Sequence, residues 1–142
     1  MQKLERSLST AYKAWLVKAR SDFKMAIAGE KDPETFDGAV YHTQQCAEKA
    51  LKAFLVFKKQ PIRKIHDLGI LLESCIGLSD DFIELKELVR ELNPYATYFR
   101  YPDDEMMPAH EDVSAAIQAA REILQFVEVK ISKATDQNTS IF

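Results

Sequence analysis

Apolar residues recur at intervals of three and four positions along most of the chain, which is the period of an amphipathic helix. Between Ser9 and Ala28 they share one helical face, and charged residues occupy the remainder. Gly29 follows, and glycine commonly ends helices. The pattern predicts a first helix over residues 9–28 with an apolar stripe of Leu8, Tyr12, Trp15, Ala19, Phe23 and Ile27.

The second predicted helix has the clearest start signal. Asp32 is a good N-cap, and Pro33 suits the first turn, where its missing amide would have no partner. Glu34 complements the positive end of the helix dipole. We expect the helix to run to about Lys59 and to stop before Pro61.

Three more helices are expected downstream. Asp67 is the expected cap of a short helix ending near Gly77, and Ser79 is the expected cap of the next. Pro94 then bends or ends that helix after Asn93. A last apolar stripe extends from about residue 108 to about residue 132.

Together these elements predict an all-α fold, an antiparallel up-and-down bundle of four to five helices. The scarcity of glycine, with four in 142 residues, favours helices over the many turns of a strand protein. The length suits one domain. We assign residues 1–133 to that domain and residues 134–142 to a frayed C-terminal tail.

The composition narrows the classes of function. A net charge of −3 argues against a protein that coats nucleic acid generally. Cys46 and Cys75 match no metal-ligand spacing, so we expect buried, reduced thiols and neither a metal nor a cofactor. No apolar run approaches the ~20 residues of a membrane span. We therefore expect a cytoplasmic protein without a membrane partner.

The second helix carries the first candidate site. Val40, Ala47, Ala50, Leu51 and Phe54 form its apolar face. A polar face at the same helical spacing is formed by His42, Gln45, Lys49 and Lys52. We interpret this face as a ligand or dimer groove in which lysine supplies charge and histidine a switchable donor. The alternative is a solvated face with local ion pairs.

Arg100, Tyr101 and Asp103 form the second candidate, in an expected loop. The planar guanidinium of Arg100 matches phosphate oxygens, and Tyr101 can stack on a base. Asp103 would orient Arg100. The alternative is a structural turn in which Arg100 pairs with Asp103.

Two weaker signals accompany these sites. His66 and Asp67 resemble a catalytic pair, but a capping role for Asp67 is the more economical interpretation. The segment 49–66 is locally basic, which suits either an acidic partner or a helix end rich in lysine. Its charged residues are Lys49, Lys52, Lys58, Lys59, Arg63 and Lys64, against Glu48.

Four sequence pieces in order resemble the HEPN (higher eukaryotes and prokaryotes nucleotide-binding) domain family. They are residues 14–23 (AWLVKARSDF), 42–53 (HTQQCAEKALKA), 64–68 (KIHDL), and 92–95 (LNPY) followed by 99–103 (FRYPD). The resemblance implies a helical bundle that usually forms a homodimer. It also implies a minimal nucleotidyltransferase as partner, in a toxin–antitoxin-like pair, and nucleotide or RNA as ligand.

Some members of that family are metal-independent ribonucleases with an arginine, four to six intervening residues, and a histidine. Arg63 and His66 are too close for this pattern, and Arg100 and His110 are too far apart. We therefore expect a nucleotide-binding or partner-binding module. One alternative is a ribonuclease toxin that uses Arg100 with His110 or His42 across a dimer. Another is a structural adaptor without a small-molecule site.

Overall fold

The computed structural model describes residues 2–62, 64–99 and 107–140, with side chains over residues 10–62, 64–99 and 107–136. No strand occurs in these ranges, and the predicted all-α bundle is confirmed. Three short 3₁₀ turns separate or extend the helices: η1 (Pro33–Thr35), η2 (Asp80–Leu85) and η3 (Asn93–Ala96). The α-helices are α1 (Gln2–Gly29), α2 (Phe36–Phe57), α3 (Leu68–Leu78), α4 (Lys86–Leu92) and α5 (His110–Ser140).

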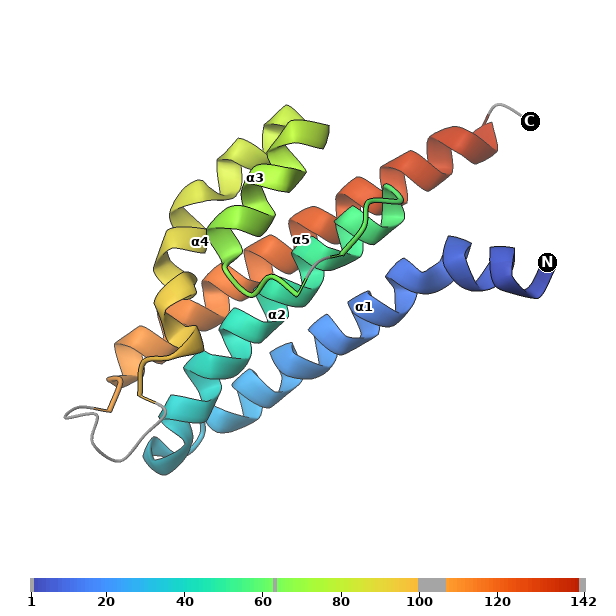
Figure 1. Ribbon diagram of the computed structural model, residues 1–142. Helices are drawn as coiled ribbons and strands as arrows, with labels where there is room; N and C mark the ends of the chain where they lie inside the picture. The colour runs from blue at the N-terminus through green and yellow to red at the C-terminus, as the bar shows by residue number, and fades with distance from the viewer. Residues whose placement is uncertain (1, 63, 100–106, 141–142) are drawn as a thin grey trace.

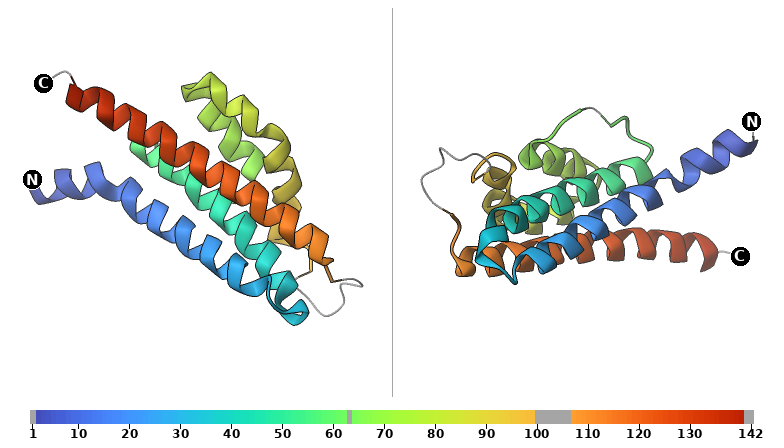
Figure 2. Two further views of the ribbon diagram at one scale, coloured as in Figure 1. Left: turned by 180° about the vertical axis from the view of Figure 1, so that it is seen from behind. Right: turned by 90° about the horizontal axis from the view of Figure 1, so that it is seen from below.

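Helix α2 is the centre of the bundle. The long helices α1, α2 and α5 lie side by side, and the shorter α3 and α4 pack as a pair beside them (Figure 1). The first turns of α1 and the last turns of α5 lie at the same end of the molecule (Figure 2). Helix α2 therefore has neighbours on most of its circumference, and 14 of its residues are buried.

The connection from α2 to α3 is a crossover, which we define as residues 58–62 and 64–67. It returns along α2, so that the Gln44 side-chain amide donates to the His66 carbonyl at 3.4 Å. Farther along, the Cys75 thiol lies 3.7 Å from the Leu51 carbonyl oxygen. Helices α2 and α3 consequently run in the same direction, whereas α1 and α2 are antiparallel.

The α1–α2 hairpin depends on close approach of the two backbones. A Cβ atom added to Gly29 would lie 3.0 Å from the Ala39 Cβ and 3.1 Å from the Thr35 carbonyl oxygen. Asp32 accepts a hydrogen bond from the Glu34 amide at 3.0 Å, as expected of the cap, although the capped turn is η1. Small residues are also buried along both helices: Ala19, Ala26, Ala39, Ala47 and Ala50.

Several helix boundaries differ from the predicted ones. Helix α1 begins at Gln2, and α5 continues to Ser140 through residues predicted to fray, because neither added segment contains glycine or proline. Ser79 precedes η2 as expected, but its hydroxyl donates to the Asp81 carboxylate at 2.6 Å and makes no capping hydrogen bond. The described helices include none long and apolar enough to cross a membrane.

The polar face predicted on α2 is only partly a surface, and the interpretation of Lys52 as exposed is wrong. Lys52 is 4% exposed, because α1 and the crossover cover it. Its ammonium donates to the Glu48 carboxylate at 3.0 Å and lies 5.6 Å from the Trp15 ring centroid. His66 Nδ1 lies 3.2 Å from the same Glu48 oxygen, Oε2. Lysine is required here as the counter-charge of a buried carboxylate.

The Glu48–Lys52 pair gives the first testable prediction. Lys52→Met should lower the free energy of unfolding by about 3 kcal/mol or more, because it leaves the Glu48 charge buried without its main partner. The free energy of unfolding of the Glu48→Leu/Lys52→Met double variant should fall much less, because neither buried charge remains. Urea unfolding followed by circular dichroism measures both differences.

The matched control is Arg90→Met, which breaks the exposed Arg90–Glu87 pair and should change stability by less than about 1 kcal/mol. If Lys52→Met is no more destabilising than the double variant, the buried pair does not have the role described.

Candidate functional site

Asp22 of α1 organises the main polar cluster between α1 and α2. It is 6% exposed, although its side chain is a carboxylate. His42 Nδ1 donates to Asp22 Oδ1 at 2.8 Å, and Lys49 Nζ donates to Asp22 Oδ2 at 2.5 Å. His42 and Lys49 lie seven residues apart on α2, so two helical turns bring both onto one buried acid. We call Asp22, His42 and Lys49 the seam cluster.

The seam cluster leaves hydrogen-bonding capacity for a ligand. An ionised carboxylate only accepts, so Nδ1 of His42 carries the proton and Nε2 is left for another partner. The Lys49 ammonium has three donors, and the bond to Asp22 uses one of them. Both side chains are partly exposed, 28% for His42 and 25% for Lys49. The cluster thus presents fixed polar groups to solvent.

A shallow cavity of about 400 Å³ adjoins the seam cluster. Trp15 and Lys18 of α1 line it together with Ala14 and with Lys49 of α2. An aromatic ring and two ammonium groups therefore border one hollow. This combination suits a ligand with a flat ring and negative charge.

Apart from the buried Lys52, the residues predicted on the polar face of α2 divide into two groups. His42 and Lys49 meet at Asp22, as a shared ligand face requires. Gln45 instead donates to the Gln44 side-chain oxygen at 2.8 Å and is tied to the buried side of α2. The prediction missed Asp22, Trp15 and Lys18. Asp22 was detectable, because it lies three residues after Ala19 on the inward face of α1, where a lone carboxylate needs partners.

Arg100, Tyr101 and Asp103, the second predicted site, lie outside the described residues. His110 lies close to Glu30, with 3.7 Å between Nε2 and the carboxylate, and its ring contacts Phe36. In the described part of the chain, no cluster of three or more histidine, cysteine or acidic side chains is arranged to hold a metal ion.

The cysteines are poor nucleophiles. Cys46 and Cys75 are both buried and free, in agreement with the prediction of buried thiols. Burial raises the pKa of the Cys46 thiol to about 12, with added contributions from the negative charges of Asp22 and Glu128. Burial alone raises the pKa of Cys75 to about 12. Neither thiol is appreciably ionised near neutral pH.

Asp67 is a helix cap, as the economical interpretation predicted. Its carboxylate accepts from the Ile70 amide at 3.1 Å and from the Asn93 side-chain amide at 3.2 Å. Asn93 also accepts from the Leu68 amide at 2.9 Å, which joins η3 to the start of α3. The Ile70 amide, then the Asn93 amide, hold the pKa of Asp67 below its usual value. His66 interacts with Glu48 rather than completing a catalytic pair with Asp67.

The basic segment 49–66 is less basic at the surface than its sequence indicates. Lys49 is paired with Asp22, and Lys52 with Glu48. Arg63 lies outside the described residues, and the exposed cations are Lys58, Lys59 and Lys64.

Comparisons with known proteins agree with this fold. The model of the HEPN domain family matches residues 12–130. The crystal structure of an archaeal HEPN homologue superimposes with a TM-score of 0.68 at 23% identity, covering 84% of this chain and 97% of that chain. The crystal structure of TT1696 from Thermus thermophilus gives a TM-score of 0.70 at 26% identity with the same coverage. No curated protein matches the sequence significantly.

Asp67 gives a pH-dependent prediction. Because its folded-state pKa is lowered, its ionised form stabilises the fold at pH values above the unfolded pKa of about 3.9. That stabilisation is lost as the pH falls through the folded-state pKa. The stability difference between wild type and Asp67→Asn should therefore be largest near pH 6, at up to about 1 kcal/mol, and should shrink below pH ~4.

Urea unfolding at a series of pH values measures this difference. Glu84→Gln removes an exposed carboxylate and serves as the control for general charge effects. An Asp67→Asn difference that stays constant from pH 6 to pH 3 would contradict the capping assignment.

Proposed function

This chain belongs to the HEPN domain family, and we propose that it acts as a dimeric binding module whose ligand is a nucleoside phosphate. The proposal includes a minimal nucleotidyltransferase as the partner, in a toxin–antitoxin-like pair, as the family resemblance implies. A cytoplasmic location accompanies it, because two buried unpaired thiols suit a reducing compartment.

The observation that supports the ligand class is the seam cluster. Hydrogen bonds to Asp22 already hold the His42 and Lys49 side chains in place. Ligand binding therefore costs little of their conformational entropy. Lys49 retains two free donors after its bond to Asp22, and phosphate oxygens are strong acceptors. With Lys18 beside it, the cavity has two ammonium groups against one buried carboxylate. Its local charge favours an anion.

Trp15 supports a nucleoside rather than a simple phosphate. The ring borders the same cavity as Lys18 and Lys49, and stacking of a base on an aromatic ring contributes about 1–3 kcal/mol. In our proposal the base lies against Trp15 and the phosphates lie between the two lysines. His42 Nε2, which Asp22 leaves unused, forms a hydrogen bond with a ribose hydroxyl.

Binding of ATP, measured by isothermal titration calorimetry, tests this proposal. Lys18→Ala should weaken ATP binding about tenfold, because a charge-assisted hydrogen bond to phosphate contributes at least about 1.4 kcal/mol. Lys18 is exposed, so its loss should leave the fold intact. Trp15→Leu should weaken the binding of ATP more than the binding of inorganic pyrophosphate, because pyrophosphate has no base to stack on the ring.

Lys86→Ala is the control, because it removes the same charge at an exposed residue of α4. Its affinity for ATP should stay within about twofold of the wild-type value. The proposal fails if the wild-type protein does not bind ATP or GTP at millimolar concentration. Cleavage of RNA by the purified protein, abolished by Arg100→Ala, would instead support the ribonuclease alternative.

The dimer in our proposal uses the outer face of α1. Val17 and Met25 are 55% and 52% exposed there, and Ser21 lies between them at helical spacing. Together with Arg20, Lys24 and Ala28 they line a shallow hollow of about 430 Å³. Small and apolar residues at this spacing allow close helix packing across a two-fold axis. This face points away from α2, so pairing would leave the seam cluster accessible.

Sedimentation velocity tests the dimer. The wild-type protein should sediment with twice the 16.2 kDa mass of one chain. Val17→Glu/Met25→Glu should give a folded monomer, because four carboxylates would face one another across the two-fold axis. Ile83→Glu, which adds a charge at an equally exposed residue of η2, should stay dimeric. A wild-type monomer at high micromolar concentration would contradict the proposed assembly.

A further inference from the structure

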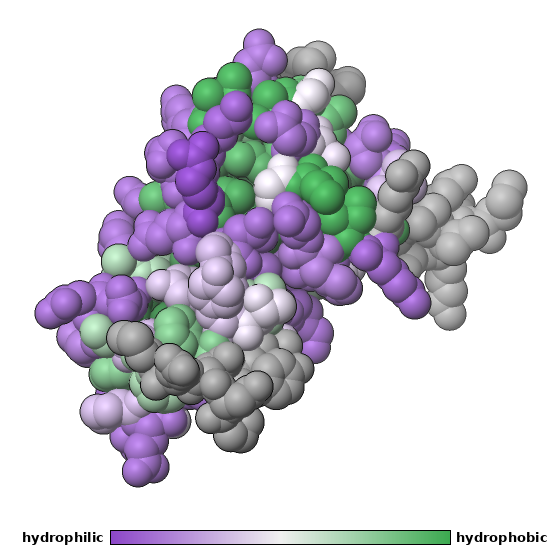
Figure 3. Space-filling model, turned by 60° about the vertical axis from the view of Figure 1, so that its left-hand side comes forward, coloured by the Kyte–Doolittle hydropathy of each residue, from purple (hydrophilic) through white to green (hydrophobic). Residues whose placement is uncertain are grey.

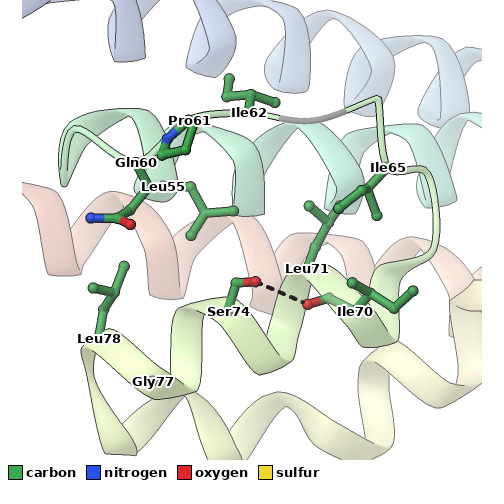
Figure 4. A pocket seen from close by; sticks show the side chains of 10 residues that line it. All are labelled: Leu55, Gln60, Pro61, Ile62, Ile65, Ile70, Leu71, Ser74, Gly77 and Leu78. Carbon is green, nitrogen blue, oxygen red and sulfur yellow. Dashed lines mark hydrogen bonds between the residues drawn. The ribbon is translucent and has the colours of Figure 1, made fainter.

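A third hollow lies on the other side of α2, between the crossover and α3. It has a volume of about 500 Å³ and contains Leu55 at its base (Figure 4). Pro61, Ile62 and Ile65 line it from the crossover, and Leu71 and Leu78 line it from α3. We call this hollow the crossover groove.

The crossover groove presents mainly carbon to a ligand. Its two polar side chains are already bonded within the chain. The Ser74 hydroxyl donates to the Ile70 carbonyl at 3.3 Å, and the Gln60 amide donates to the Lys58 carbonyl at 3.2 Å. The other side chains of the lining are apolar, so the groove favours an apolar side chain over a nucleotide or sugar.

Large apolar side chains at the groove remain in contact with water. Ile70 is 54% exposed and Leu78 is 39% exposed, although neighbouring Leu71 is buried. In the space-filling view, hydrophobic side chains gather in the upper part of the molecule, over α3 and the crossover, with hydrophilic side chains around them (Figure 3). A clustered exposed apolar surface of this kind is typical of an interaction site.

The groove ends at a basic hollow. Leu78 lines both the groove and a neighbouring cavity of about 260 Å³, which also contains Lys58, Lys130 and Lys133. The Lys130 ammonium is paired with Asp81, and Lys58 lies 5.8 Å from the rings of Phe54 and Phe57. Three lysines against one carboxylate give this end a local positive charge.

We propose that the crossover groove and the neighbouring hollow lined by Lys58, Lys130 and Lys133 together bind a segment of a partner protein in which a bulky apolar residue lies close to acidic residues. The apolar side chain fills the groove between Ile65 and Leu71, and the carboxylates reach Lys58 and Lys133 beyond Leu78. Charge complementarity selects this occupant: an apolar segment without acidic residues would leave the lysines unpaired. Helix α3 has 11 residues and is about 16 Å long, which matches a short linear segment.

This surface is separate from the seam cluster in both position and chemistry. The seam cluster lies between α1 and α2, whereas the groove lies between the crossover and α3. A partner segment at the groove would leave the seam cluster unobstructed, so the inference stands independently of the nucleoside phosphate proposal.

Selection from a random 12-residue peptide library against the full-length protein tests the inference. The enriched peptides should contain a large aliphatic or aromatic residue within a few positions of aspartate or glutamate. Fluorescence anisotropy of one such peptide should show at least tenfold weaker binding to Leu78→Ser and to Lys133→Glu. Its affinity should fall as salt is raised, because the lysine contacts are screened.

Ile83→Ser and Lys86→Glu are the matched controls, because they make the same changes at exposed residues away from the groove. Both should bind the peptide within twofold of the wild type. The inference is overturned if no peptide is enriched, or if the enriched peptides lack the apolar–acidic pattern or bind Leu78→Ser normally. It is also overturned if Leu78→Ser converts a wild-type oligomer to a monomer, because a second copy would then occupy the groove.

Discussion

The enclosure of α2 is the constraint on which the rest of the structure depends. A central helix with neighbours on most sides leaves little of its surface in water, yet α2 carries histidine, glutamate, lysine and glutamine along its length. Each of these must find a partner inside the protein, because an unpaired buried charge costs several kcal/mol. Asp22 from α1 satisfies His42 and Lys49, and Glu48 satisfies Lys52 within α2 itself. Polar pairing thus fixes how α1 and the crossover meet α2.

Helical periodicity was sufficient to predict the elements, because each apolar stripe buries against a neighbour. It was insufficient for the polar face of α2, because periodicity shows which residues share a face but not what covers that face. Lys52 is an example: the sequence places it beside His42 and Lys49, and only the crossover and Trp15 make it buried. Asp22 was missed for the related reason that its partners lie 20 and 27 residues away.

The short motifs behind the family resemblance acquire physical roles in the fold. The His66-Asp67 pair and Asn93 lie far apart in sequence but meet at the start of α3, where Asp67 and Asn93 share the free amides of the helix. Their role is structural, because they hold the crossover against α2 and determine where α3 begins. The Asp22, His42 and Lys49 positions differ, because two of these side chains keep unused hydrogen-bonding capacity at the surface.

The crossover explains why the protein has two chemically different surfaces on either side of one helix. A tight turn after α2 would have placed α3 antiparallel to it and closed the space over Leu55. The return of the crossover along α2 instead sets α3 parallel and leaves an apolar groove between crossover and helix. The same return carries His66 to Glu48, whose Oε2 thereby gains a second partner beside Lys52. On the opposite side of α2, the seam with α1 contains His42 and Lys49, which can bind an anion. The groove is lined mainly by apolar side chains, which suit an apolar segment.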